Sequence, residues 1–188
     1  MPVDPPPGRL LVKRMGHSIT RTIPKPVVII DSHELLPFDF SRFPNWIKDV
    51  KTQPLAAGDY TVEGMEDLLI LERKSLVDLI GTVIQRRYRF IDLCERLAQY
   101  RWRAIIVEAN YCNIKTVYEK LGLETIAHPN AVSGTLDAAE VRYNIPIIYT
   151  SRNKALAEEK AASWLSKHFT YWYLEEHGLG RVLQSGDL

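Results

Sequence analysis

The sequence has little cysteine and no long apolar run, and these absences exclude several classes of protein. Among 188 residues only Cys94 and Cys112 are cysteines, too few for a disulfide framework or a four-ligand zinc site by themselves. The longest apolar runs, such as 27–30 and 104–107, fall far short of the ~20 residues that a membrane span needs. The N-terminus also lacks the apolar stretch of a secretory signal. We therefore expect a globular intracellular protein without membrane contact, cytoplasmic or nucleoid-associated if its source is prokaryotic or viral.

A net charge of one sign is also lacking, because 24 basic residues nearly balance 23 acidic ones. The formal net charge of +1, taken alone, argues against a strongly basic nucleic-acid-binding protein. The distribution along the chain differs from this average. Residues 1–26 carry a net charge of +4, residues 31–80 carry −5, and residues 86–103 carry +4. Two basic segments around an acidic one are compatible with an acidic site beside a phosphate-binding surface.

Segments typical of strands and of helices alternate along the chain. Strands are predicted at 27–31, 103–108 and 145–150, with a hairpin formed by 59–63 and 68–74. Helices are predicted at 75–84, 88–100, 114–121, 130–143 and 154–176, with a loop and a short helix within 38–49. This order predicts a single α/β domain over residues 27–180, with a mixed central sheet flanked by helices.

The two ends of the chain are predicted to lie outside this domain. Residues 1–26 are rich in proline and glycine and carry five basic residues. They are predicted to form an extended basic arm with at most one short strand, at residues 10–12. Residues 181–188 are predicted to be a tail.

The predicted hairpin brings charged residues together. With residues 64–67 as its loop, Asp59 falls opposite Glu72, and directly opposed residues have Cβ atoms about 5 Å apart. Two carboxylates at that distance repel each other unless something such as a divalent cation neutralises them. Lys74 lies two residues beyond Glu72 and so on the same face, where its ammonium can orient a water or stabilise a pentacovalent phosphate. Arg73 points the other way.

A third carboxylate strengthens the interpretation as a metal site. Asp31 ends a buried strand, where open α/β sheets place their sites, and Glu34 follows three residues later. Carboxylates are hard ligands that suit Mg²⁺ or Mn²⁺ and not zinc. Opposed acidic residues in a hairpin are more often a solvated edge, although Glu72 here follows the apolar run 68–71. The residues alone leave the metal site and the solvated edge both open.

Two of these segments resemble a known family. Gly58-Asp59-Tyr60 and the run 72–78 resemble the signature of XPF-type structure-specific endonucleases, which have a restriction-endonuclease-like fold with a PD-(D/E)xK motif. The resemblance extends through 27–34, 89–97 and 105–108. It implies that Mg²⁺ or Mn²⁺ is held by three carboxylates: Asp31, Asp59 and Glu72. It also implies a set of catalytic and supporting residues: Asp59, Glu72, Lys74, Arg73 and Glu34.

The same resemblance implies a DNA endonuclease of repair or recombination. Such an enzyme hydrolyses phosphodiester bonds at branched, flapped or single-strand/duplex junction structures. The alternatives are a catalytically silent DNA-binding scaffold or regulatory partner, and a junction resolvase. His33 occupies the position of a family arginine, as a weakened phosphate contact or as a packing residue. The helix-hairpin-helix modules of longer family members are not found, so structure selectivity from them is not expected.

Basic residues next to the predicted site are interpreted as DNA contacts. Six arginines are interleaved with aromatic residues, and some of them are expected to bind phosphate, although a solvated helix face is the alternative: Arg86, Arg87, Arg89, Arg96, Arg101 and Arg103. The first three of these are assigned to DNA. Arg89 matches a family arginine that reaches the scissile phosphate. Two residues of the arm, Lys13 and Arg14, are added to this group.

Two further features have a structural and a functional interpretation. Asp78 falls within the family motif, but Ser75-x-x-Asp78 is also a helix-capping pattern, and the capping role is favoured. The last helix carries an apolar stripe that predicts core packing, with a homodimer or heterodimer contact as the alternative. Its members are Ala157, Ala161, Trp164, Leu165, Phe169 and Trp172.

Overall fold

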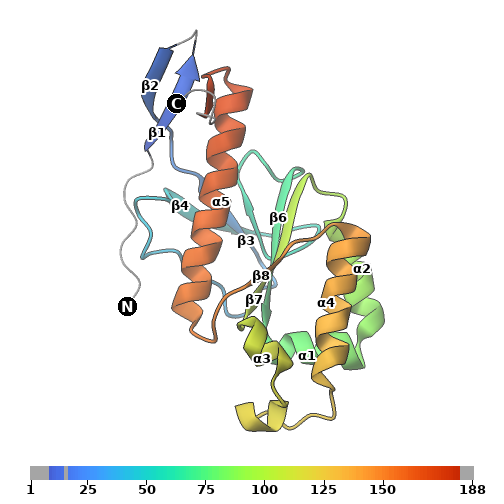
Figure 1. Ribbon diagram of the computed structural model, residues 1–188. Helices are drawn as coiled ribbons and strands as arrows, with labels where there is room; N and C mark the ends of the chain where they lie inside the picture. The colour runs from blue at the N-terminus through green and yellow to red at the C-terminus, as the bar shows by residue number, and fades with distance from the viewer. Residues whose placement is uncertain (1–8, 15–16, 183–188) are drawn as a thin grey trace.

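A six-stranded mixed sheet forms the centre of the protein in the computed structural model, which describes residues 9–14 and 17–182 (Figure 1). Within this sheet β5 is antiparallel to both of its neighbours, whereas the other adjacent strands are parallel. The strands lie in the order β4 (Asp49–Gln53), β3 (Val27–Asp31), β5 (Tyr60–Val62), β6 (Leu69–Ser75), β7 (Trp102–Glu108) and β8 (Ile147–Tyr149).

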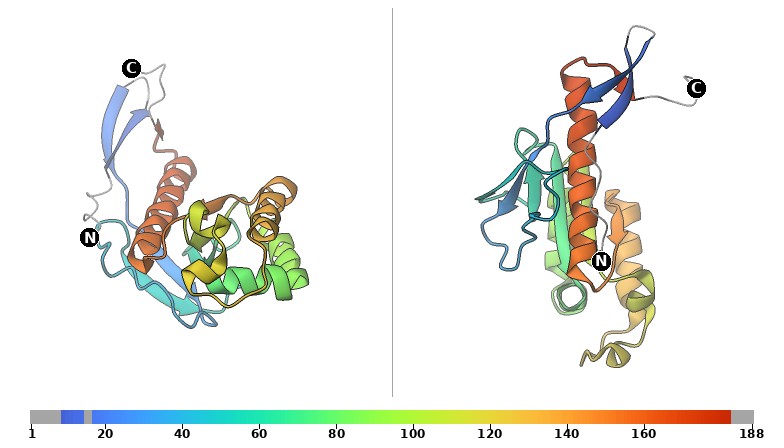
Figure 2. Two further views of the ribbon diagram at one scale, coloured as in Figure 1. Left: turned by 60° about the horizontal axis from the view of Figure 1, so that its bottom comes forward. Right: turned by 90° about the vertical axis from the view of Figure 1, so that its left-hand side faces the viewer.

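Helices cover both faces of this sheet, as Figures 1 and 2 show. The helices α1 (Leu76–Gln85), α2 (Arg87–Leu97) and α4 (Pro129–Tyr143) lie on one face, and α5 (Lys154–Glu176) lies on the other. Successive residues of β6 point to opposite faces, so Leu69 and Leu71 pack in the core on the α5 side while Ile70 packs among α1, α2 and α4. The predicted single α/β domain with a mixed sheet is confirmed.

The apolar stripe of α5 is part of the intramolecular core. Ala157, Ala161, Leu165 and Phe169 are buried against the sheet, and the two tryptophans of the stripe pack partly buried beside them. The predicted core role is confirmed, and these side chains are used within the subunit. No helix in the described residues is long and apolar enough to cross a bilayer.

The elements between the sheet and α4 are shorter than predicted. In place of one helix over 114–121, the chain forms α3 (Tyr111–Lys115) and a 3₁₀ turn, η1 (Tyr118–Leu121). The Asn110 side chain caps α3 and accepts a hydrogen bond from Asn113 N, which starts the helix earlier. The extended backbone at Thr116 then ends it.

Four strands differ from the sequence predictions. The short helix predicted within 38–49 is wrong, because residues 38–48 form turns and irregular backbone. Residues 49–53 form β4, for which no strand was predicted, and most of this edge strand is exposed. Residues 9–14 and 17–22 form an antiparallel hairpin, β1 (Arg9–Arg14) and β2 (His17–Thr22), where at most one strand was predicted. Within the predicted tail, β9 (Arg181–Val182) pairs with β1, next to the C-terminal end of α5 (Figure 1).

Candidate active site

One edge of the sheet gathers the predicted acidic residues. Because β3 is antiparallel to β5 and β5 to β6, the carboxyl ends of β3 and β6 meet the amino end of β5. The Tyr60–Leu71 pair in the ladder confirms the predicted register, which sets Asp59 opposite Glu72. Position 58, just before Asp59, requires glycine, because its φ is +65° and a Cβ there would lie 2.5 Å from Ile70 Cγ1.

Strand alternation then sorts these residues by face. Residues two positions apart on a strand point to the same face of the sheet. Glu72 therefore lies on the face of Ile70, which packs on the α1 and α2 side. By the same rule Asp31 lies on the face of Ile29, and Asp59 on the face of Thr61, so all three carboxylates face the α1 and α2 side. Glu72 is buried and forms an ion pair with Lys74, two residues further along the same face. This arrangement is the one that the hairpin pattern predicts.

Burial perturbs both opposed carboxyls, Asp59 and Glu72. Burial and the nearby Glu72 carboxylate raise the pKa of Asp59 from 3.8 to about 8, against the opposing effects of Arg73 N–H and Lys74. Asp59 Oδ2 accepts a hydrogen bond from Arg73 N at 2.6 Å. Burial also raises the pKa of Glu72, although Lys74 opposes the rise. When fully ionised, the site would carry more negative charge than its surroundings compensate, and the raised pKa of Asp59 means that this carboxyl holds a proton at neutral pH.

Lys74 stays protonated beside these carboxylates. Burial acts to lower its pKa, but Glu72 and Asp59 act in the opposite direction and the pKa is raised overall. Lys74 is therefore a permanent positive charge at neutral pH. An ammonium at this place can stabilise negative charge that develops on a group bound there.

Asp31 lies on the neighbouring strand and is joined to the same edge. Its Oδ1 accepts a hydrogen bond from Leu55 N at 3.0 Å, and its backbone N donates to Asp59 O at 2.8 Å. His33 Nδ1 lies 3.3 Å from the carboxylate of Asp31, and the His33 side chain is 82% exposed. The interpretation of His33 as a packing residue is therefore wrong.

Arg73 and Glu34 lie together on the other face of β6. Arg73 Nε donates to Glu108 Oε1 at 2.7 Å, and its Nη1 donates to Glu34 Oε1 at 3.2 Å and to Leu36 O at 3.0 Å. Its guanidinium carbon lies 5.0 Å from the centre of the Phe38 ring. The cluster fixes the segment that follows β3, and it connects to the site through the Arg73 N–H on Asp59.

Arginines border a hollow of about 470 Å³ over the acidic edge. Arg86, Arg89 and Arg96 line it together with Asp31, Glu72 and Lys74. Arg96 is one of the interleaved arginines for which a phosphate contact was considered from the sequence, and its spacing of seven residues from Arg89 places both on one face of α2.

Arg87 is not brought to this hollow. It lines a separate depression beside Thr135 and Arg142 of α4. The side chains of Lys13 and Arg14 lie outside the described residues. Asp78 has the predicted capping role beside the N-cap Ser75, because its Oδ2 accepts a hydrogen bond from Ser75 Oγ at 2.7 Å and its backbone N donates to the same Oγ at 3.1 Å.

The donor set of the acidic edge fits a hard divalent cation. In the described ranges no three His, Cys, Asp or Glu side chains converge into a ready coordination sphere, and Glu72 is instead paired with Lys74. The carboxylates of Asp31, Asp59 and Glu72 nevertheless share one face of one edge, and the raised pKa of Asp59 marks charge that a cation would neutralise. All three are oxygen ligands of the type that Mg²⁺ and Mn²⁺ accept.

Comparisons with known proteins bear on the family and the fold of the chain. The ERCC4 domain model matches residues 30–161. The chain is similar to the solved structure of XPF from Aeropyrum pernix, with a TM-score of 0.60 and 20% identity over 81% of this chain and 69% of that one. It is also similar to XPF from Aeropyrum pernix in complex with DNA, with a TM-score of 0.52 and 24% identity over 77% and 66% of the two chains. Comparison with curated proteins gave no match.

Proposed function

Since the chain belongs to the ERCC4 domain family, a family of XPF-type nucleases, we propose that it is a metal-dependent DNA endonuclease. It hydrolyses phosphodiester bonds at branched, flapped or single-strand/duplex junction structures. The observation that carries the proposal is the opposed pair Asp59 and Glu72 on one face of the sheet. Glu72 is buried and paired with Lys74, and both line the hollow that the arginines border. The negative charges of such an opposed pair do not stabilise the fold, but they can hold the metal ion that phosphodiester hydrolysis uses.

Each residue has a role in this proposal. Asp31, Asp59 and Glu72 would hold Mg²⁺ or Mn²⁺, which when bound lowers the pKa of an attacking water and neutralises phosphate charge. The Lys74 ammonium stabilises the negative charge on the phosphate under attack. Arg86, Arg89 and Arg96 hold the backbone phosphates of the substrate over the hollow. Arg73 and Glu34 act as positioning residues, because they touch the site through the N–H that Asp59 accepts.

The test is cleavage of a panel of labelled DNAs with Mg²⁺, with Mn²⁺ and with EDTA. The panel contains a flap, a fork, a four-way junction, a nicked duplex and an intact duplex. Cleavage is expected only with a divalent cation and on branched substrates. Asp59→Ala and Glu72→Ala are each expected to reduce the cleavage rate by about 10³-fold or more, with DNA affinity changed less than about threefold.

A matched control separates the site from general loss of acidic charge. Glu63→Ala removes an exposed carboxylate from the same hairpin, where it pairs with Lys51, and it should cleave at the wild-type rate. If the Asp59→Ala or Glu72→Ala protein cleaved at the wild-type rate, the site assignment would be wrong. DNA binding without metal-dependent cleavage of any substrate would assign the chain as a catalytically silent scaffold.

A further inference from the structure

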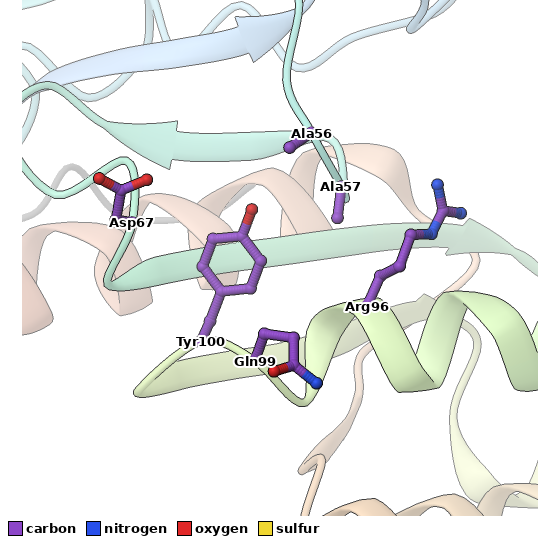
Figure 3. A pocket seen from close by; sticks show the side chains of 6 residues that line it. All are labelled: Ala56, Ala57, Asp67, Arg96, Gln99 and Tyr100. Carbon is purple, nitrogen blue, oxygen red and sulfur yellow. The ribbon is translucent and has the colours of Figure 1, made fainter.

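A second hollow adjoins the candidate active site, and we propose that it binds one unpaired nucleobase of the DNA substrate. The proposal rests on the proposed nuclease function, because it places the base next to the scissile phosphate. The hollow has a volume of about 360 Å³ and is lined by Ala56, Ala57, Asp67, Arg96, Gln99 and Tyr100 (Figure 3). That volume falls within the range of small-ligand sites, about 300–1,000 Å³.

The two hollows are continuous in their lining. Ala56, Ala57 and Arg96 border both the hollow at Tyr100 and the hollow that contains Glu72 and Lys74. Burial raises the pKa of Glu72 and of Tyr100, and the Arg96 guanidinium partly opposes the rise in both. Arg96 therefore lies within electrostatic reach of each hollow, where it can hold the phosphate that joins two neighbouring nucleotides.

The walls of the second hollow have the chemistry that a nucleobase needs. Figure 3 shows the Tyr100 ring standing between Asp67 on one side and Arg96 on the other, with its hydroxyl directed toward the loop that carries Ala56 and Ala57. An aromatic ring and two alanine methyl groups offer stacking surface to any base. The Tyr100 hydroxyl and the side chains of Asp67 and Gln99 supply donors and acceptors for the edges of a base.

Tyr100 is held in place before any ligand arrives. Its backbone N donates to Leu97 O at 3.1 Å, and its carbonyl accepts from Arg103 Nη1 at 2.6 Å. The ring is also partly packed on the core formed with α1, α2 and α4. A fixed ring loses little conformational entropy when a base stacks on it, which favours binding.

The hollow distinguishes an unpaired base from a paired one. A base within a duplex must leave its stack and its partner to enter a side pocket, and this penalty is lowest for a base that is already single-stranded or mismatched. A phosphate alone has no use for the alanine and tyrosine surface. The hollow therefore selects DNA with an unpaired nucleotide beside the cleaved bond, so that the nuclease domain itself contributes to structure selectivity.

The test is a scan of a forked DNA with single abasic sites around the cleaved bond, with affinity measured by fluorescence anisotropy in EDTA. For the wild-type protein, removal of one base within about two nucleotides of that bond should weaken binding roughly tenfold. Tyr100→Ala should be insensitive to the same abasic site, whereas Tyr100→Phe should keep the full effect. Tyr171→Ala is the matched control, because this exposed tyrosine lies on α5, at the other face of the sheet.

A spectroscopic measurement uses the wild-type protein alone and so does not depend on how a variant folds. 2-Aminopurine at the sensitive position should lose fluorescence on binding, because it stacks on Tyr100. A flat abasic scan on a fork that the protein cleaves, an undiminished abasic effect in Tyr100→Ala, or unquenched 2-aminopurine would each overturn this inference and leave the nuclease function standing. Absence of both DNA binding and cleavage would instead overturn the proposed function, and this inference with it.

Discussion

The two sides of the carboxyl end of β6 differ in how their charges are balanced. On one side the Arg73 guanidinium lies between Glu108 and Glu34 and against the Phe38 ring. On the other side the Lys74 ammonium pairs with Glu72 and acts on Asp59, and the pKa of Asp59 is still raised to about 8. The charges of the first side, called the balanced side below, stabilise the fold through these contacts. The second side, called the reactive side below, has carboxylates that repel one another when all are ionised, so that Asp59 holds a proton at neutral pH in a place that a cation can take.

Removal of the Lys74 charge should break the reactive side with the largest effect. Lys74→Met is expected to reduce the single-turnover cleavage rate about 10²- to 10³-fold, because no ammonium then stabilises the charge that develops on the phosphate. DNA affinity, measured by anisotropy, should change less than about threefold.

Lys51→Met is the control for that variant. Lys51 also forms an ion pair with a glutamate, Glu63, but both side chains of that pair are about half exposed. Exposed pairs contribute about 0–1 kcal/mol, so this variant should cleave and unfold like the wild type. A Lys74→Met protein that retained more than a tenth of the wild-type rate would refute the role given to Lys74.

Removal of the Arg73 charge should affect the balanced side. It should lower the free energy of unfolding more than it lowers the cleavage rate of the folded protein. Arg73→Met leaves Glu34 and Glu108, which are only 13% and 12% exposed, without their cation. Breaking a buried pair from one side costs about 3 kcal/mol or more of unfolding free energy. We expect a loss of about 3 kcal/mol in urea denaturation, and a smaller loss of cleavage per folded molecule than in Lys74→Met.

Arg101→Met is the control for Arg73→Met, because it shows how much the loss of an exposed arginine changes the unfolding free energy. Arg101 lies over the Trp102 ring and 3.7 Å from Glu175, but its side chain is 57% exposed. The expected change in unfolding free energy is within about 1 kcal/mol. Equal losses for the two arginine variants, or a greater loss of cleavage in Arg73→Met than in Lys74→Met, would contradict the division between the two sides.

The reactive side was largely predictable from sequence, and the balanced side was not. The opposition of Asp59 and Glu72 follows from a short hairpin loop, and the shared face of Glu72 and Lys74 follows from strand alternation. Both are local rules. The contact of Arg73 with Glu108 spans 35 positions and depends on the parallel pairing of β6 with β7, which no local pattern specifies.

Misassignments on the surface have a similar cause. Arg87 and Arg96 are both arginines of α2, but the rotation of the helix turns Arg87 toward α4 and Arg96 toward the site. Composition alone does not fix that rotation. The strand β4 was missed because most of its residues are exposed, so the apolar alternation that reveals a strand is absent.

The smallest predicted effect is the change in unfolding free energy per pH unit when the reactive side is titrated in the absence of metal. The pKa of Asp59 in the folded protein is about 8, against an ordinary 3.8, so the folded state holds this proton more tightly than the unfolded chain. The stabilising contribution of the protonated group is complete below pH 4 and is lost as the pH rises through 8. Asp59→Asn removes that loss, and its advantage over the wild type in urea denaturation with EDTA should grow by about 1 kcal/mol per pH unit between pH 5 and 7.

Addition of Mg²⁺ should then reverse the order of the two proteins. A cation that binds the ionised carboxylates favours the folded state of the wild type, and Asp59→Asn, which keeps only Asp31 and Glu72 of the three, should gain little. The comparison at pH 8 reads stability and not cleavage, so it tests the metal site even if the chain cuts no DNA. Parallel pH profiles for the two proteins, or equal stabilisation by Mg²⁺, would show that the charge at Asp59 is already compensated and that the two sides of β6 do not differ.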